Sequence, residues 1–472
     1  MNTLAAGRTF EDSNASPIGR LLPELLCSIF TLAVPAQKYN TPSVFVVGRR
    51  SWDGPVILGV PWVFGQVCSE WRMLATCLPA LWTSITLTTT LLPRDLPLLH
   101  TQLARSGTAL LDVFIRFTVG PHRLHAYENN PSAKEPFGIF LPSLIAQSSR
   151  WRTLHIQFEG YAHDDDDLSL PGLNPDALPH LEELRFTGDT LNSHIQPFDL
   201  FGEAPALRCI ALGIMGGFAK SPLRLRWDQL TTYKATCRNA AVHLRNLAAA
   251  PALVECDISF ENALESQIRG EGAVVTLLHL RRLAVSHPAF LDRIATPALK
   301  SLYVVGPEYY RGLIKNTGPV LYILPFLQRS ECTLQLAELT LVDCPSPVPE
   351  IVALLQQTSG LTSLSLKLSR SPPSFANDLV TALAAPNSLC PALQSLSWAD
   401  FDDALDREAF ADMVASRCSE STAVCRLHFV SLYAGRQRMK TAGWRVRALP
   451  RLEATFLNAK KGRPAVRKWR ED

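Results

Sequence analysis

Few residues in this sequence have types and spacings that suggest chemistry. The acidic run at 163–167 could attract a divalent cation, but adjacent carboxylates lack the spacing of a calcium-binding loop, so a solvated loop is favoured. His155 and His428 fall on expected strands, where we expect polar surface histidines rather than ligands or bases. Phosphate-binding, nucleophile-elbow and zinc-protease motifs do not occur, and no cysteines have the C-x-x-C spacing of a zinc-dependent ring. We therefore expect no enzyme, no cofactor and no metal.

The cysteines and the apolar segments indicate the compartment. The eleven cysteines are scattered singly, and Cys209, Cys237 and Cys256 fall in or beside expected strands as small apolar side chains. No secretory-type apolar run is visible near the start, and the longest uncharged stretch near membrane length, 73–93, contains Pro79 and seven Ser or Thr residues. The sequence thus predicts an intracellular protein, cytoplasmic and/or nuclear, with reduced thiols and no membrane partner.

Length and composition favour a large folded body with a basic end. A chain of 472 residues fits about three domains or one extended repeat array, and 47% hydrophobic with 19% charged residues excludes wholesale disorder. The net charge of +3 is unevenly spread, because twelve Lys or Arg but only three acidic residues follow position 435. We expect 453–472 to be a solvated basic tail, with a nuclear-import patch or a weak nucleic-acid contact as the alternatives.

Two amphipathic stripes near the N-terminus indicate a small helical unit, after an expected disordered segment at 1–16. Apolar residues at helical spacing form the first stripe: Leu22, Leu25, Leu26, Ile29 and Phe30. A second stripe spans 64–78, and the segment 37–60 between them is rich in Gly, Pro and aromatic residues, as in an insertion. Periodicity alone leaves two alternatives, because the helices either dock on the rest of the chain or keep one face for another protein.

The two stripes resemble the two halves of a fungal F-box domain. Residues 18–30, I-G-R-L-L-P-E-L-L-C-S-I-F, are similar to I-x-x-L-P-x-E-L-L-x-x-I-F, and residues 61–85 to V-C-x-x-W-R-x-x-A-x-x-x-P-x-L-W-x-x-I. The resemblance implies an F-box-like domain over 17–88 that binds the Skp adaptor of a cullin-type ubiquitin ligase. The adaptor-binding residues that it implies are Leu21, Pro23, Leu25, Leu26, Ile29, Phe30, Val67, Trp71, Leu74, Leu81 and Trp82. The last five supply either the domain's core or the rest of the adaptor surface.

The remainder of the chain repeats an apolar signature, L-x-x-L-x-h, in which h is apolar. Copies spaced 19 to 37 residues apart start at Trp151, Leu181, Leu207, Leu230, Leu253, Leu280, Leu299, Leu336, Leu361, Leu393 and Val424. The last two apolar positions alternate around one variable residue, which is the period of a β-strand, and helix-like stretches precede several copies. One unit buries too little apolar surface to fold alone, so neighbouring units must stack and complete a shared core.

This pattern resembles a leucine-rich-repeat domain, a familiar companion of F-box domains. The resemblance implies an α/β fold class, in which a short all-helical unit precedes an irregular solenoid with parallel strands over 89–452. Only the copy at Leu336 has the Asn or Cys of the full consensus, at Cys344. An ordinary α/β domain with alternating strands and helices is the alternative.

In such an array the variable strand residues face the concave side. They are mostly small or polar and carry both charges, whereas a nucleic-acid track is uniformly basic and bears stacking aromatics, so we expect no nucleic-acid partner. The candidates for binding a target protein are Glu183, Arg185, Lys234, Glu255, Asp257, Arg282, Tyr303 and Lys367. A face that binds nothing is the other interpretation.

Together the two resemblances imply a substrate-recognition subunit of a Skp–cullin–F-box ubiquitin ligase. The N-terminal helices would bind the adaptor and the repeats would hold an unknown protein substrate. The alternative function is a non-catalytic repeat scaffold that does not engage a ubiquitin ligase.

Overall fold

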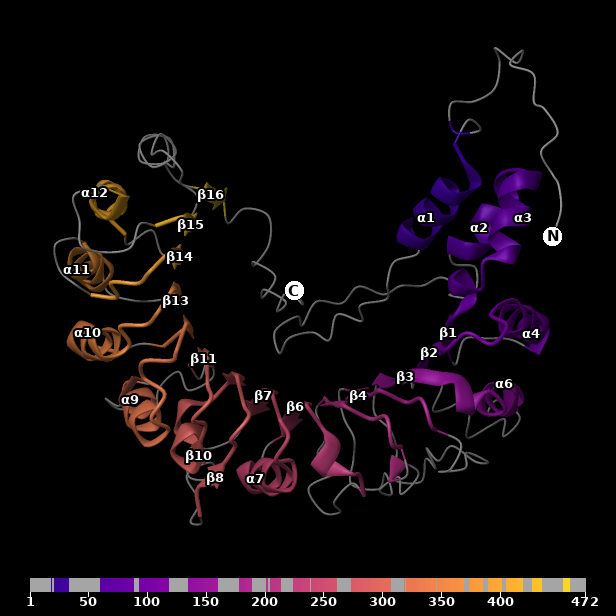
Figure 1. The fold of residues 1–472 in the computed structure, drawn as a ribbon, viewed down its shortest axis with the longest axis horizontal. Helices are drawn as coiled ribbons and strands as arrows, with labels where there is room; N and C mark the ends of the chain where they lie inside the picture. Colours follow the sequence, from indigo (N-terminus) through magenta and orange to yellow (C-terminus); the bar gives the residue numbers. More distant parts are fainter. Residues whose placement is uncertain are drawn as a thin grey trace, which may run out of the picture. The chain divides into compact units, whose positions relative to one another are not determined.

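The computed structural model of the chain contains two compact units (Figure 1). Unit 1 comprises Met1–Thr118 and His122–Leu154, and unit 2 comprises Val119–Pro121 and His155–Asp472. The structure describes residues 18, 21–33, 60–88, 93–118, 135–159, 178–188, 201–202, 204–213, 224–237, 239–260, 273–306, 318, 320–344, 346–368, 373–384, 389–400, 405–418, 427–434 and 453–458. Among the helices in these ranges, none has both the length and the apolar character that a membrane span requires.

Three short helices open unit 1 and pack around aromatic side chains. They are α1 (Pro23–Ala33), α2 (Val60–Val67) and α3 (Ser69–Cys77). Pro23 begins α1, where its missing N–H costs nothing, and Glu24 complements the positive end of the helix. Phe30 stacks on Phe64 with 4.2 Å between ring centroids and meets Trp71 edge-on at 4.8 Å. Such aromatic pairs add about 0.5–1.5 kcal/mol beyond their buried area, so they hold the three helices together.

Unit 1 continues beyond the helices into further strands, of which only the one at Trp151 was predicted from the sequence. Its further elements are η3 (Pro79–Trp82), β1 (Ser84–Thr88), η4 (Pro93–Asp95), α4 (Leu96–Arg105), β2 (Leu111–Thr118), α6 (Glu135–Ile145), η6 (Ser148–Arg150) and the start of β3 (Trp151–Glu159). β1 and β2 are parallel, with Ser84 opposite Asp112. The helices and these strands belong to one compact unit.

Unit 2 contains a large parallel sheet whose strands follow one another in chain order, as the α/β expectation requires. The order is β4-β5-β6-β7-β9-β11-β12-β13-β14-β15-β16, and every neighbouring pair is parallel. The strands are β4 (Glu183–Gly188), β5 (Cys209–Leu212), β6 (Thr232–Cys237), β7 (Glu255–Phe260), β9 (Arg282–Val285), β11 (Ser301–Val305), β12 (Glu338–Val342), β13 (Ser363–Leu368), β14 (Ser395–Asp400), β15 (Phe429–Ala434) and β16 (Glu453–Asn458). The short strands β8 (Val275–Thr276) and β10 (Ile294–Ala295) pair separately.

The leucine signature marks these strands because its three apolar positions point into the core. In the first copy in this sheet, Leu181, Leu184 and Phe186 are completely buried, whereas Glu183 and Arg185 between them are half-buried. Each copy from Leu181 to Leu393 is followed, two residues after its start, by the first residue of a strand. The strands predicted from these copies are therefore confirmed.

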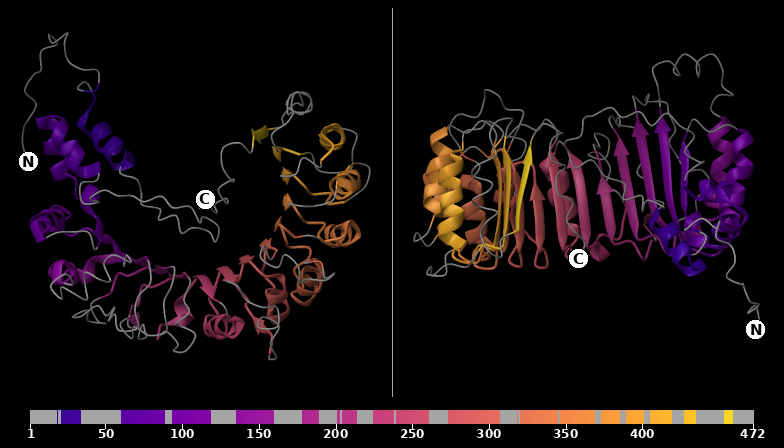
Figure 2. Two further views of the ribbon diagram at one scale, coloured as in Figure 1. Left: turned by 180° about the vertical axis from the view of Figure 1, so that it is seen from behind. Right: turned by 90° about the horizontal axis from the view of Figure 1, so that it is seen from above.

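The helices of unit 2 lie on one side of its sheet. They are α7 (Ala240–Ala249), α9 (Val320–Arg329), α10 (Val348–Gln357), α11 (Pro373–Leu383) and α12 (Arg407–Cys418), with the 3-10 turns η10 (Trp227–Gln229) and η11 (Pro288–Arg293). Figures 1 and 2 show α7 and α9 to α12 in a row along one face of the sheet. No helix of the described residues covers the other face. Each helix points its apolar stripe at the strands, as Ile351 and Leu354 of α10 do.

Three close approaches join neighbouring repeats of unit 2. The Cys344 thiol donates weakly to the carbonyl oxygen of Val304 on the preceding strand, at 3.7 Å, so the consensus cysteine links two repeats. Next to it, a Cβ on Gly306 would lie 1.9 Å from the carbonyl oxygen of Asp343, and only glycine fits there. Farther along, the buried Arg417 donates to the carbonyl oxygen of Leu383 at 2.7 Å, which satisfies the end of α11.

The sequence misplaced the repeats near the C-terminus. The predicted copy at Val424 is three residues early, because Leu427, Val430 and Leu432 are the buried positions of β15. β16 pairs with β15 where the basic tail was expected to begin, so the sheet extends through Asn458. The expectations for 1–16, 37–59, 163–167 and 459–472 lie outside the described residues.

Candidate functional site

Helix α1 has two apolar faces, one buried and one exposed. Leu26 and Phe30 point inward and are buried against Phe64, Ala75 and Trp82. Three large apolar side chains on its other face, and Leu22 directly before the helix, stay in solvent. Of their surface 63%, 51%, 43% and 84% is exposed, in the order Leu22, Leu25, Ile29 and Leu32. These four residues are named the outer stripe of α1. Large apolar groups gathered on one short helix are typical of a surface that binds another protein.

The structure divides the predicted adaptor-binding residues into two groups. Pro23, Leu25, Ile29 and Val67 are exposed, as an adaptor surface requires. The completely buried residues are Leu26, Phe30, Leu81 and Trp82, and the half-buried residues packed against them are Leu21, Trp71 and Leu74. A buried side chain cannot contact a partner while the unit stays folded, so Leu26, Phe30, Leu81 and Trp82 belong to the core. For Leu81 and Trp82 this was one of the two alternatives, whereas Leu26 and Phe30 were expected to bind the adaptor. The sequence missed the exposed Leu22, Leu32, Val63 and Met73, since helical spacing alone does not say which face is covered.

The tryptophans of the helical unit are held from within unit 1. Trp82 donates from Nε1 to the carbonyl oxygen of Ala75 at 2.7 Å. Its ring meets Trp62 edge-on at 5.0 Å, and the Arg105 guanidinium lies over both rings, 4.5 Å from Trp82 and 5.1 Å from Trp62. Cation–π contacts of this kind contribute about 0.5–2 kcal/mol. Arg105 therefore fastens α4 to the helices that carry the outer stripe.

A second candidate surface is the face of the unit 2 sheet that the helices leave uncovered, named the strand face. Because the strands pair in register, its variable residues form rows across the sheet. One row contains Glu183, Cys209, Thr232, Glu255, Arg282, Ser301 and Glu338. The next row contains Arg185, Ala211, Lys234, Asp257, Ala284, Tyr303 and Thr340. The predicted target-binding residues of neighbouring repeats therefore lie side by side.

Two pairs of oppositely charged residues on the strand face form ion pairs, and such pairs are called closed below. Arg185 forms an ion pair with Glu183 on its own strand, and Arg282 forms one with Glu255 on the neighbouring strand. The Cys209 thiol donates to Glu183 at 3.4 Å, and burial together with the Glu183 charge raises the pKa of that thiol to about 12. Cys209 thus stays protonated at neutral pH and is no nucleophile.

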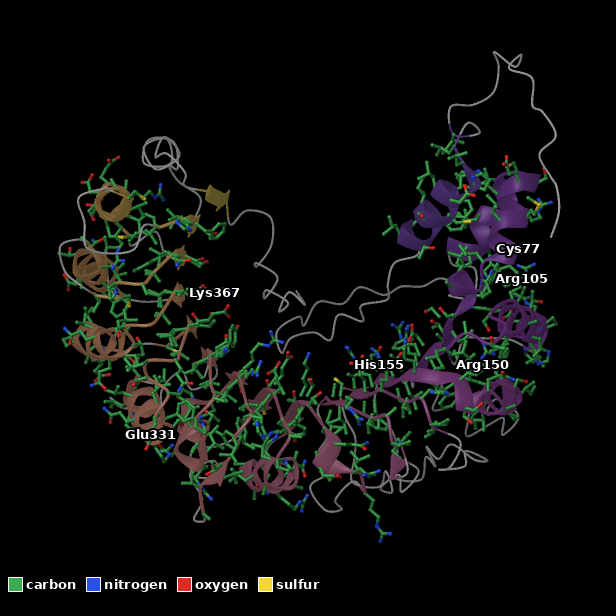
Figure 3. The ribbon with its side chains drawn as sticks, viewed as in Figure 1. Cys77, Arg105, Arg150, His155, Glu331 and Lys367 are labelled. Atoms are coloured by element: carbon green, nitrogen blue, oxygen red, sulfur yellow. The ribbon has the colours of Figure 1, made fainter. Side chains whose placement is uncertain are left out.

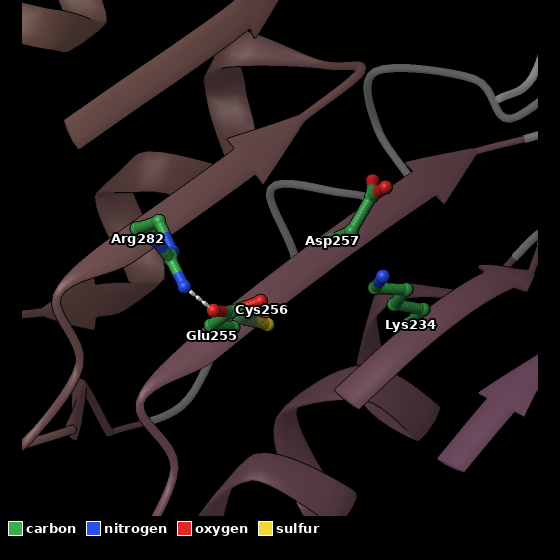
Figure 4. A pocket seen from close by; sticks show the side chains of 5 residues that line it. All are labelled: Lys234, Glu255, Cys256, Asp257 and Arg282. Carbon is green, nitrogen blue, oxygen red and sulfur yellow. Dashed lines mark ion pairs between the residues drawn. The ribbon is translucent and has the colours of Figure 1, made fainter. Parts of the chain in front are cut away.

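Lys234 and Asp257 differ from these pairs. Figure 4 shows them on adjacent strands beside the closed pair of Arg282 and Glu255, with no ion pair drawn between them. Burial raises the pKa of Asp257 to about 6, and the Lys234 charge opposes that rise. Burial, followed by the Asp257 charge, raises the pKa of the Tyr303 phenol to about 12. The surface around Lys234 and Asp257 is a shallow depression, which is lined by Lys234, Glu255, Cys256, Asp257 and Arg282.

The strand face changes character along the sheet. Beyond Glu338 and Thr340 of β12 the same two rows continue with small hydroxyl side chains, Ser363 and Ser365 on β13 and Ser395 and Ser397 on β14. Lys367 stands apart from the charged group, on the strand side of unit 2 (Figure 3). The charged candidates from Glu183 to Arg282 thus form one group, which Lys367 does not join.

The side chains first considered for chemistry have structural roles. His155 is buried rather than on the surface, and its Nε2 lies 2.8 Å from Oγ1 of Thr187 on the neighbouring strand β4. His428 is exposed, as expected. Cys256 is buried, as a small apolar side chain would be. Within the described ranges, no three His, Cys, Asp or Glu side chains gather in a way that could hold a metal ion.

Comparisons with known proteins add no assignment. No protein-family model matches the chain, and no curated protein matches its sequence. The functional proposal therefore depends on the two surfaces, the outer stripe of α1 and the strand face, and on the motifs of the sequence.

Proposed function

We propose that this protein is the substrate-recognition subunit of a Skp–cullin–F-box ubiquitin ligase. In this proposal α1 to α3 form an F-box-like domain that binds the adaptor, and unit 2 is an irregular leucine-rich-repeat-like solenoid that holds a target protein on its strand face. The protein is then intracellular, in the cytoplasm, the nucleus or both, and it performs no chemistry itself. Its partners are the adaptor, the cullin ligase behind it and a protein substrate, with neither nucleic acid nor membrane among them.

The observation that carries the proposal is the outer stripe of α1. Helices α1 to α3 already have a complete core, so Leu25 and Ile29 are not needed to stabilise their own unit. Burying each such side chain in a contact contributes about 1.5–3 kcal/mol. The stripe lies within the motif at 18–30 that resembles an F-box, where the adaptor surface is expected.

The repeat proposal is supported by the order and the burial of the strands. Parallel strands that follow chain order, with a buried leucine two residues before each large-sheet strand from β4 to β15, are what stacked repeats produce. The bond from Cys344 to the preceding strand stands where the repeat consensus expects Asn or Cys. An ordinary α/β domain usually places helices on both faces of a parallel sheet, whereas the described helices of unit 2 lie on one.

Such a subunit would accelerate ubiquitin transfer through proximity alone. Holding a target near a charged conjugating enzyme raises the effective concentration of the target's lysines and turns an encounter between two molecules into a local reaction. The proposed division of labour therefore needs no catalytic side chain in this chain.

The test is a binding titration of the purified full chain with a purified Skp adaptor. Replacing Ile29 with Asp should weaken binding at least about 100-fold, because an unpaired charge would be buried in the contact. Leu25→Asp should act in the same way. Leu26→Asp is unsuitable, since Leu26 lies in the core and its replacement would unfold the helices.

The matched control is Thr31→Asp, which adds the same charge to an exposed position of the same helix, away from the outer stripe. It should bind the adaptor as the wild type does. Hydrogen exchange of α1 to α3 must be alike in all variants. Wild-type affinity of a folded Ile29→Asp variant, or no adaptor binding by the wild type, would overturn the proposal.

A non-catalytic repeat scaffold is the second candidate function, and one contact favours it. Arg105 of α4 covers the rings of Trp62 and Trp82, so the rest of unit 1 already covers part of the apolar surface of the helices without any adaptor. In that case the chain would still bind a target through the strand face but would not co-purify with a ligase. The adaptor titration separates the two functions.

A further inference from the structure

Some charged side chains of the strand face have an ion-pair partner and others have none among the described residues. Glu183 and Glu255 each have an arginine partner. Among the described residues, neither Lys234 nor Asp257 has an ion pair or a side-chain hydrogen bond, although their Cα atoms are direct partners across β6 and β7. Parallel strands lie about 4.8 Å apart, so the ammonium and the carboxylate stand side by side, one donor and one acceptor without a partner.

The neighbours in the same row keep both groups accessible from outside. Ala211 precedes Lys234 and Ala284 follows Asp257, so only methyl groups stand on either side of the two charges. Both alanines are buried, while Lys234 and Asp257 remain half-buried and line the shallow depression of Figure 4. A group from a partner can therefore approach the two charges without moving a large side chain.

The surrounding charges decide what that group is. A cation beside Asp257 would also meet Lys234, and Arg282 lies just beyond it. An anion beside Lys234 would meet both Asp257 and Glu255. The six charged residues from Glu183 to Arg282 on this face, three acidic and three basic, balance to zero, so this group of charges attracts neither sign.

A carboxamide can satisfy both charges at once from two separate atoms, whereas a hydroxyl must donate and accept through one oxygen. The carbonyl oxygen of the amide accepts from an ammonium, and its NH₂ donates to a carboxylate. Burial has already removed much of the water around Asp257 and raised the pKa of this carboxyl, which makes a donated hydrogen bond more valuable there than on an open surface.

We propose that Lys234 and Asp257 form a recognition subsite for the side-chain amide of a glutamine or asparagine in an uncharged segment of the target protein. The carbonyl oxygen accepts from Lys234 Nζ, and the NH₂ donates to the Asp257 carboxylate. The inference rests on the proposed function, because it names the target chemistry of the strand face. A phosphorylated or otherwise acidic segment does not fit this subsite.

The probe is a random twelve-residue peptide library, displayed on phage and selected on the full chain with counter-selection on the Asp257→Ala variant. The selected peptides should share a glutamine or asparagine and have little net charge. The most enriched peptide is then synthesised with its amide residue intact, and with that residue changed to Leu, Lys, Glu or phosphoserine. Only the amide peptide should bind at the original affinity, and the Leu version should lose about ten-fold.

Protein variants give a second readout, in which the sign of the effect matters. Lys234→Met and Asp257→Ala should each weaken binding of the amide peptide about ten-fold, because each removes one of its two hydrogen bonds. A cationic partner would instead bind Lys234→Met more tightly, and an anionic partner would bind Asp257→Ala more tightly. Lys300→Met and Asp228→Ala make the same changes at exposed positions outside the candidate residues and should leave binding unchanged.

Every outcome bears on the proposal. Peptides selected for Lys and Arg or for acidic residues, equal binding of the Leu version, or tighter binding by either variant overturns the amide subsite. So does a library with no peptide that depends on Asp257. Failure here leaves adaptor binding by the outer stripe unaffected, and the adaptor titration tests that part of the proposed function separately.

Discussion

Helices α1 of unit 1 and α10 of unit 2 have similar lengths and similar apolar spacing, but their apolar side chains are used differently. In α10, Ile351, Leu354 and Leu355 are all buried under their own sheet. In α1, Leu26 and Phe30 are buried, while the four leucine and isoleucine side chains of the outer stripe remain in solvent. α10 thus has one apolar face and α1 has two.

The difference shows how a helix can be stable and still bind a partner. A helix with one apolar stripe uses it for its own core and then presents a polar surface. A helix with two stripes can use one for folding and keep the other for binding, since the two contributions come from different side chains. α1 is built in this second way, and mutations on its two faces should have opposite consequences.

The largest expected effect is the loss of the inward face of α1. Phe30→Ala removes a ring that stacks on Phe64 and meets Trp71, and it should destabilise unit 1 by about 3–5 kcal/mol. Leu25→Ala, on the outer stripe, should change the free energy of unfolding by about 0.5 kcal/mol or less. Urea titration and hydrogen exchange of α1 to α3 measure both.

Leu354→Ala of α10 serves as the reference for a fully used helix. It should destabilise unit 2 by about 2–5 kcal/mol, because Leu354 is completely buried. If Leu25→Ala destabilised unit 1 as strongly as Phe30→Ala, the outer stripe would belong to the core and the distinction between the helices would disappear.

The same contrast explains which parts of the fold the sequence could predict. The leucine signature located the strands from β4 to β14, because each strand buries the same three positions against helices of its own unit. It missed β1, where Trp82 stands in place of the first leucine and Ile85 in place of the second. It missed β2, where Val113 replaces the second leucine. Aromatic or branched side chains fill the same core space, so a leucine-based pattern is too narrow.

The candidate sites were harder to predict than the strands. Helical spacing placed Leu25 and Leu26 in one stripe, although one is exposed and the other buried, because burial depends on α2 and α3, which lie beyond the insertion. Likewise, the variable strand positions identified the strand face. Its division into closed and open charge pairs depends on the register between strands, which sets Lys234 opposite Asp257 and Arg282 opposite Glu255.

A smaller effect should appear when unit 2 is titrated with acid. His243 of α7 is buried against Phe260 and hydrogen-bonds through Nδ1 with the Tyr233 hydroxyl at 3.1 Å, and burial lowers its pKa to about 3. The unfolded chain binds a proton near the ordinary histidine pKa of about 6.5, so stability falls as the pH drops from there towards 3. The loss that His243 alone causes should reach about 2 kcal/mol at pH 5, and the raised pKa of Asp257 partly offsets it.

Urea titrations at pH 7 and pH 5 check this, with His243→Phe as the comparison. The variant keeps an aromatic ring in the cluster and has no group to titrate at that position, so its stability should fall less between the two pH values. Equal losses in both proteins would mean that water reaches the inward face of α7. The inward face of α7 would then be open to water, as the outer stripe of α1 is, and the contrast between the two units would weaken.

The smallest expected effect concerns the surface charges of unit 1. Arg152 holds Asp112 with two hydrogen bonds, from Nε at 3.1 Å and from Nη2 at 2.6 Å, but 44% of the arginine side chain is exposed. Asp112→Asn should therefore destabilise unit 1 by only about 0.2–1 kcal/mol, and a double-mutant cycle with Arg152→Gln should give a coupling that fades in 1 M salt. A coupling above about 2 kcal/mol would place an exposed ion pair on a par with the buried face of α1. Apolar burial would then no longer account for the difference between the two faces of that helix.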